Sequence, residues 1–320
     1  MEPKTLQDAI LFFSDKVNCR EYLVARRWPD GVECPKCGSK NVLFMEKYNR
    51  WHCREKHPAP QFTLKTGTIF EDSPLGLDKW LTAMWMVVNC KNGVSSYEVH
   101  RAIGVTQKSA WFMDHRIREA LKNGTILKLG GSGSPVEVDE TFIGGKAKNM
   151  HTAKRKRVIT RRGAHDKTIV FGILERGGKV KAQVIPNRMG KTVKPILAEH
   201  VEAGSAIHTD EMTGYTALHE TYLHDVVNHA YEYVKGQVHT NGIENFWSLL
   251  KRGINGTYVA IEPFHLDRYL DEQMFRFNNR ATQKQNVTDS DRFSLAVSQI
   301  VGKRLTYAEL TGKTGQGSSL

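Results

Sequence analysis

The segments "VEVDETFIG", residues 136–144, and "TIVFGILERGGKVKAQVIPN", residues 168–187, decide the fold of the second half of the chain. The first has the apolar and β-branched residues of a strand, and the second divides about the turn "RGGK" into a β-hairpin. Downstream, the pattern predicts a helix over 190–202, short strands at "SAIHTD" and "DVVNHA", and helices near 242–254 and 263–279. Three successive strands followed by alternating helices and strands indicate an α/β domain with a mixed sheet.

Three acidic residues of this domain stand at positions that suit a metal site. Asp139 lies in the first strand, Asp210 at the end of a later short strand, and Glu244 near the start of a helix. Adjacent strands could hold the two aspartates near each other, and three oxygen donors would bind Mg²⁺ or Mn²⁺. Two such ions can activate a water or a 3′-hydroxyl at a phosphodiester. Each acid also has a structural alternative, since Asp210 could bond its own backbone in a turn and Asp139 could pair with a lysine.

The segment "QVHTNGIENFWSLLKRG", residues 237–253, leaves the role of Glu244 open. If Asn241 is the N-cap, a Glu at the third helical position can complete a capping box. Alternatively, Glu244 is the third metal ligand, with Asn241 as a neutral oxygen alternative. The helical period places Glu244, Ser248 and Lys251 on one polar stripe, which suits a metal ligand followed by a phosphate-binding lysine. The apolar stripe beside it contains Ile243, Phe246, Trp247, Leu250 and Ile254.

The charge balance favours a polyanionic partner. Among 320 residues, 46 Lys plus Arg face 34 Asp plus Glu, a net charge of +12. Such a sign most often indicates nucleic acid. The densest basic segment runs from Gly144 to Lys167, with nine Lys or Arg and one acid, Asp166. It directly follows the first predicted strand, so we expect it to bind substrate phosphates through Lys154, Arg155, Lys156, Arg157, Arg161 and Arg162.

The N-terminal region has the spacing of a zinc ribbon. After one helix expected at about residues 5 to 26, the motif "CPKCG" holds Cys34 and Cys37, and Cys53 is followed four residues later by His57. A tetrahedral Zn²⁺ takes four such ligands from two turns, with His52 the less favoured choice as the fourth. Residues 28–70 are otherwise poor in core residues, so a structural zinc should be needed for them to fold.

Residues 75–122 are helical throughout. In "SSYEVHRAIGVTQKSAWFMDHRIREAL", Ser95 and Thr106 are suited to N-caps and Gly104 to the turn between two helices. This pattern is typical of a helix-turn-helix, whose second helix would present Gln107, Lys108 and Arg116 to the major groove. The structural alternative is a plain three-helix bundle with a solvated polar face.

The motifs "CPKCG", "GTIFEDSPLGLDKW", "VEVDETFIGGK", "HTDEMTGY" and "HTNGIENFWSLLKRGINGTY" together resemble a known family. From about residue 15 to 280 the chain is similar to bacterial insertion-sequence transposases with an N-terminal zinc ribbon, related to the Merlin elements. The resemblance implies a ribonuclease-H-like DDE domain in which Asp139 and Asp210 match the first two carboxylates. Related sequences use Glu or Asn as the third residue, hence Glu244 or Asn241. His57 stands where the family has a cysteine.

The resemblance further implies metal-dependent cleavage of double-stranded DNA at the terminal inverted repeats and strand transfer into target DNA. We expect a homodimer or higher multimer on DNA, in the cytoplasm at the nucleoid, because no signal peptide and no run of about 18 apolar residues is visible. A non-catalytic DNA-binding regulator derived from a transposase is the alternative function. The expected domains are a helix and zinc ribbon (1–72), helix-turn-helix (73–125), flexible linker (126–135), catalytic domain (136–281), and C-terminal helix and tail (282–320).

Overall fold

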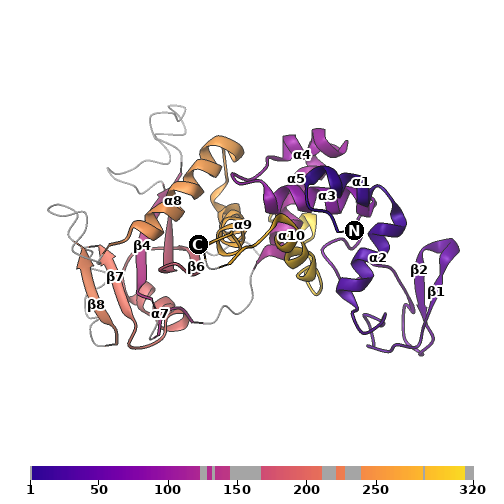
Figure 1. The fold of residues 1–320 in the computed structure, drawn as a ribbon, viewed down its shortest axis with the longest axis horizontal. Helices are drawn as coiled ribbons and strands as arrows, with labels where there is room; N and C mark the ends of the chain where they lie inside the picture. Colours follow the sequence, from indigo (N-terminus) through magenta and orange to yellow (C-terminus); the bar gives the residue numbers. More distant parts are fainter. Residues whose placement is uncertain are drawn as a thin grey trace. The chain divides into compact units, whose positions relative to one another are not determined.

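The computed structural model describes residues 2–122, 128–131, 134–144, 167–210, 221–227, 239–283 and 285–313. Contacts divide the chain into two compact units. Met1–Lys122 and Asn279–Ser319 form the first, and Asn123–Asn278 form the bulk of the second. Figure 1 shows the helices and strands of each unit along the chain.

The first unit is mainly helical, with a small three-stranded antiparallel sheet in the order β1-β2-β3. The sheet follows "CPKCG" in the chain, and its strands β1 and β2 form an antiparallel hairpin. The elements are α1 (Leu6–Phe13), α2 (Lys16–Arg27), β1 (Val42–Met45), η1 (Glu46–Tyr48), β2 (Arg50–Cys53), β3 (Gln61–Phe62), α3 (Leu77–Asn89), α4 (Ser96–Ile103), α5 (Gln107–Leu121), α10 (Asp289–Ser298) and α11 (Tyr307–Leu310).

Two predictions about the first unit need correction. The single helix expected over residues 5–26 is two helices, because Asp15 turns the chain and accepts a hydrogen bond from Val17 N–H as N-cap of α2. The C-terminal segment is a structural part of this unit, since α10 inserts Phe293, which is fully buried. Its ring lies 5.6 Å from that of Phe13 and 5.0 Å from that of Trp85, between ring centroids.

The second unit is a mixed α/β sheet, as the strand pattern predicts. Its order is β6-β5-β4-β7-β8. β4, β5 and β6 pair antiparallel, whereas β7 runs parallel to β4 and β8 runs parallel to β7. The elements are β4 (Val136–Ile143), β5 (Thr168–Glu175), β6 (Val180–Ile185), α7 (Gly190–His200), β7 (Ala206–Asp210), β8 (Leu223–Val227), α8 (Asn241–Gly253), the π-helical η5 (Ile254–Tyr258), η6 (Pro263–His265) and α9 (Leu266–Asn278).

Alternate residues of the strands serve two separate cores. α8 and α9 cover one face, where Val170 and Leu174 of β5 meet the apolar stripe of α8. α7 packs on the other face, where Leu197 meets Val136 and Val138 of β4 (Figure 1). The apolar stripe expected on α8 is therefore confirmed.

The Gly/Ser-rich stretch expected to be a linker is partly ordered on the second unit. Leu129 is buried in the core under α7 and pairs with Val201 as an isolated bridge. Gly131 N–H donates to the hydroxyl of Ser205 at 2.9 Å. A flexible linker was therefore the wrong expectation for residues 128–131. The expectation relied on the Gly/Ser-rich composition and overlooked Leu129, which packs in the core. Among the described residues, none of the helices is both long enough and apolar enough to span a bilayer.

Candidate functional site

A pocket of about 590 Å³ opens where β4 meets α8. It brings together Asp139 from the strand with Glu244 and Lys251 from the helix, which are residues predicted from sequence to act together. Glu244 and Lys251 are exposed, and Asp139 is half-buried. The lining residues are Asp139, Glu140, Thr141, Thr240, Glu244, Trp247, Ser248 and Lys251.

Asp139 and Asp210 lie on neighbouring parallel strands, β4 and β7. In the parallel pair β4–β7, Val136 is level with Ile207 and Glu137 with His208. Two further residues along each strand bring the register to Asp139 and Asp210, which ends β7. The side chain of Asp210 lies outside the described part of the structure, so only its place on the strand is known.

Trp247 of α8 anchors Asp139. Its indole Nε1–H donates to Asp139 Oδ2 at 3.0 Å. The strand residue paired with Asp139 is Gly172. A Cβ atom at Gly172 would lie 2.5 Å from Cζ2 of the indole. Any side chain at this position would therefore clash with the Trp247 ring. Trp247 was expected to be a core residue, and it is buried, but sequence gave no sign of this hydrogen bond.

Glu244 does not complete a capping box. The N-cap of α8 is Thr240, so Asn241 is the first helical residue and Glu244 the fourth, contrary to the expected register. Glu244 Oε1 instead accepts a hydrogen bond from the hydroxyl of Thr240 at 3.0 Å. The backbone N–H of Ile243, which a capping residue would normally satisfy, donates to Oε2 of Glu137 at 2.9 Å. The helix end is thus capped by Glu137 of β4 and not by Glu244.

Asn241 is placed differently from Glu244. It is exposed at the first position of α8 and is not among the residues that line the pocket. Lys251 lies seven residues after Glu244 on the same stripe, about two helical turns away. The pocket therefore combines a carboxylate with a cation along α8, as the polar stripe predicts.

A larger hollow of the second unit, about 750 Å³, lacks this chemistry. Phe142, Arg188 and Phe264 are among its lining residues, and Asp267 is the one acid among the lining residues that the structure describes. A metal-dependent reaction needs several oxygen donors converging on one point. The smaller pocket is for that reason the candidate active site.

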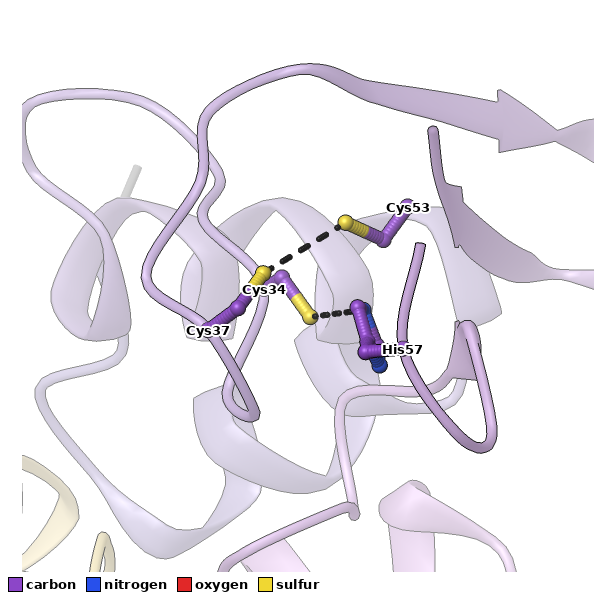
Figure 2. A group of neighbouring side chains, drawn as sticks. All are labelled: Cys34, Cys37, Cys53 and His57. Atoms are coloured by element: carbon purple, nitrogen blue, oxygen red, sulfur yellow. Dashed lines mark hydrogen bonds between the residues drawn. The ribbon is translucent and has the colours of Figure 1, made fainter. Parts of the chain in front are cut away.

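The four predicted zinc ligands converge in the first unit. Cys34, Cys37, Cys53 and His57 each offer one ligand atom, and these atoms all lie within 4.8 Å of one another. Cys34 Sγ is 3.4 Å from His57 Nε2, and Cys37 Sγ is 3.6 Å from Cys53 Sγ. Figure 2 shows the side chains pointing toward a common centre. Three thiol sulfurs and one imidazole nitrogen are a donor set that fits a tetrahedral Zn²⁺.

The second ring nitrogen of His57 supports the choice of this residue over His52. His57 Nδ1 lies 2.9 Å from the carbonyl oxygen of Pro58, which leaves Nε2 directed at the sulfurs. Such a partner fixes the ring of a metal-binding histidine. His52 precedes Cys53 on β2 and so points to the other face of the strand. Only His57 belongs to the cluster found among the described residues.

The turn between α4 and α5 has the expected caps. Ser95 and Glu98 form a capping box, Gly104 adopts φ +63° at the end of α4, and Thr106 caps α5. Lys108 is exposed, with its ammonium 4.7 Å from the Tyr307 ring centroid. Gln107 is half-buried and donates to the hydroxyl of Ser96 at 2.9 Å.

Arg116 cannot serve as a base-reading side chain in this unit. It is only 4% exposed, and its guanidinium donates to the carbonyl of Glu71 at 2.6 Å. It also lies over the rings of Trp80 and Phe112, and burial lowers its pKa. Arg116 therefore stabilises the core, because its side chain turns inward from α5. The helical period alone could not distinguish this inward position from an exposed one.

The predicted phosphate-binding residues of the basic segment lie outside the described residues. This holds for Lys154, Arg155, Lys156, Arg157, Arg161 and Arg162.

Comparison with known proteins finds two family models on the chain. The model described as "ISXO2-like transposase domain" matches residues 128–278, and the model described as "Transposase zinc-ribbon domain" matches residues 14–55. A protein from Halobacterium salinarum, "Uncharacterized protein in transposable element ISH50", is 29% identical over 243 residues, 72% of this chain and 80% of its own. An "Uncharacterized transposase-like protein" from Haemophilus influenzae is 33% identical over 108 residues, 33% of this chain and 87% of its own.

Proposed function

Since the chain belongs to the ISXO2-like transposase family, we propose that it cuts DNA at the ends of an insertion sequence and transfers the exposed 3′-hydroxyl to target DNA. The observation that carries this proposal is the pocket in which Asp139, Glu244 and Lys251 meet. A set of three carboxylates is supported by the position of Asp210 at the end of β7, the strand parallel to the β4 strand that carries Asp139.

The proposed catalytic unit has a ribonuclease-H-like fold. Its sheet joins an antiparallel β4-β5-β6 meander to two parallel strands on the far side of β4, in the order β6-β5-β4-β7-β8. The central strand β4 carries Asp139, and its parallel neighbour β7 carries Asp210. The strand order supports the proposed fold separately from the sequence motifs on which the family resemblance rests.

Asp139, Asp210 and Glu244 would hold Mg²⁺ or Mn²⁺ through carboxylate oxygens, the ligands that both ions prefer. Bound there, the metal would polarise the scissile phosphate and activate the attacking oxygen. The protein contributes the remaining functions. Trp247 orients Asp139, Thr240 orients Glu244, and Lys251 provides a positive charge for a phosphate oxygen. Each of these two carboxylates thus accepts a hydrogen bond from a neutral donor on or next to α8.

DNA binding is assigned to three regions. α5, with Gln107 and Lys108, would act as the second helix of a helix-turn-helix, and Arg116 is left out because it is buried. The zinc ribbon would add a second contact. The basic residues between Gly144 and Lys167 would bind phosphates next to the active site. A homodimer or larger multimer on DNA remains a prediction from the family resemblance.

The test is cleavage and strand transfer with duplex DNA that carries the element end, in Mg²⁺ and in Mn²⁺. Asp139→Asn should abolish both reactions while the melting temperature and DNA affinity stay near those of the wild type. Glu199→Gln is the matched control, because this exposed acid of α7 lies in the same unit but away from the pocket. A fully active Asp139→Asn protein would reject the proposed function. An inactive wild type that binds the element end would instead favour the DNA-binding regulator.

A further inference from the structure

Glu137 is a fully buried carboxylate that sequence reasoning did not single out. It lies in β4 two residues before Asp139, and its side chain is 0% exposed. Residues two apart on a strand face the same side, so Glu137 and Asp139 both face α8. An acid so deeply buried must be paired and hydrogen-bonded to be tolerated.

The two oxygens of Glu137 join the strand to the start of α8 and to the β5–β6 turn. Oε2 accepts the backbone N–H of Ile243 at 2.9 Å, and Oε1 accepts Nε–H of Arg176 at 2.9 Å. The same guanidinium donates to the carbonyl of His239, just before α8, at 2.9 Å. It also lies 3.2 Å from Nδ1 of His208 on β7. One ion pair therefore ties together β4, β7, the β5–β6 turn and the start of α8.

The close approach of helix and strand depends on Gly242. A Cβ atom at this position would lie 2.7 Å from Oε2 of Glu137 and 3.0 Å from Cδ2 of Leu174. Any larger residue would therefore displace the carboxylate or lift the helix. The absence of a side chain at Gly242 thus leaves the space that the Glu137 carboxylate occupies.

α8 is attached to β4 at two points with matching spacing. Ile243 bonds to Glu137, and four residues later Trp247 bonds to Asp139, two residues along the strand. Four helical residues rise about 6 Å, and two strand residues rise about 6.6 Å. Two such bonds prevent α8 from sliding along β4 or pivoting on it. If the Ile243–Glu137 bond is lost, Trp247 keeps the second polar attachment, and the apolar stripe of α8 still packs on the sheet.

We propose, resting on the function proposed above, that Glu137 is a positioning residue which sets α8 on β4 so that Glu244 and Asp139 face the same metal. Arg176 is its partner in this role. Glu137 touches neither metal nor substrate, and acts through the place of the helix. Displacing a catalytic group by about 1 Å can cost about 100-fold in rate, so the loss of one attachment should be visible in catalysis.

The test compares Glu137→Gln with wild type in Mn²⁺ binding, followed by electron paramagnetic resonance, and in single-turnover cleavage. Gln keeps the size of the side chain but brings an NH₂ donor against Ile243 N–H or Arg176, both of them donors. We expect weaker Mn²⁺ binding, a higher half-saturating metal concentration, and cleavage reduced about 10- to 100-fold. Unchanged Mn²⁺ binding and cleavage would overturn the inference.

Leu197→Ala is the control for a loss of stability alone. Leu197 of α7 is fully buried on the face of the sheet away from α8, so its truncation should lower the melting temperature without altering Mn²⁺ binding. Equal losses of Mn²⁺ binding in Glu137→Gln and Leu197→Ala would show that Glu137 contributes only to stability and would overturn the positioning role. Asp139→Asn separates the two proposals: if it too binds Mn²⁺ and cleaves like wild type, the proposed function fails as well.

Gly242→Ala decides the matter if Glu137→Gln does not fold. This substitution retains every charge and improves helix propensity. Its new Cβ atom, however, would lie too close to Oε2 of Glu137 and should displace the carboxylate. Reduced Mn²⁺ binding in a folded Gly242→Ala protein supports the positioning role. Wild-type binding and cleavage in that variant would contradict it.

Discussion

Trp247 reaches Asp139 through the space that Gly172 leaves open, so one helix residue and one strand glycine determine how the first carboxylate is held. The indole ring belongs to the core beneath α8, while its N–H belongs to the pocket. The Trp247 side chain therefore contributes both to core packing and to the proposed active site. A substitution that keeps the ring but removes the N–H tests the second contribution by itself.

Trp247→Phe removes the donor and keeps an aromatic ring. Loss of one hydrogen bond should cost about 0.5–1.5 kcal/mol of stability, beyond any cost of the smaller ring. Cleavage should fall further than that stability change explains, because Asp139 loses its orientation. Thermal melts beside single-turnover cleavage provide the measurement. Wild-type cleavage by a folded Trp247→Phe protein would show that Asp139 needs no such anchor.

Glu244→Gln distinguishes a metal ligand from a helix-end residue. The amide can still accept from the Thr240 hydroxyl, so folding and DNA binding should stay near normal. Strand transfer of a pre-nicked element end should collapse, because one negative donor is lost. Asn241→Ala is the companion variant, and it should transfer strands nearly as well as wild type since its side chain is outside the pocket. An inactive but well-folded Asn241→Ala protein would move the ligand role to Asn241.

Lys251→Gln should weaken DNA binding through a single phosphate contact. Losing one contact lowers the log–log salt dependence of affinity by about 0.9. Arg252→Gln is a matched control, since Arg252 is also exposed on α8 but is not among the residues that line the pocket. Affinity titrations at several salt concentrations should show the change of slope for Lys251 alone. Equal slopes for the two variants would argue against a phosphate at Lys251.

Metal analysis should find one tightly held zinc per chain. Cys37→Ser removes one of four converging ligands and should lose both the zinc and specific DNA binding, because the metal site couples ligand binding to the folding of this region. Cys90→Ser should keep the zinc, since this thiol is not part of the cluster. Protein purified without chelator and found free of zinc would remove the ribbon assignment.

Lys108 and Arg116 should behave differently although both lie on α5. Lys108→Ala should reduce the preference for the element end over other DNA and leave the melting temperature nearly unchanged. Arg116→Ala should instead lower the melting temperature, because the buried guanidinium loses its bond to Glu71 and its packing on Trp80. The folded fraction of the Arg116→Ala protein should still prefer the element end over other DNA. Loss of sequence preference in a fully stable Arg116→Ala protein would contradict this placement.

Local patterns were enough to predict much of the architecture. The apolar stripe of α8, the hairpin about Gly177, and the caps at Ser95 and Thr106 depend on residues within a few positions of one another. Spacing likewise predicted the ligand cluster around Cys34, because two turns of a hairpin must meet.

Contacts between distant segments could not be predicted in this way. Glu137 caps a helix that begins 104 residues later in the chain (241 minus 137), and only the strand register brings the two together. The inward turn of Arg116 depends on where α3 places Trp80. The break at Asp15 was missed because the residues on both sides favour a helix.

The position of α10 has a consequence for the order in which the chain can fold. A ribosome releases Phe13 and Trp85 early, but Phe293, which packs against both, only after the entire second unit has been synthesised. Until then the aromatic core of the first unit is incomplete and exposed to water. A nascent chain therefore completes its first unit last, and a fragment ending at Lys122 would lack part of its own interior.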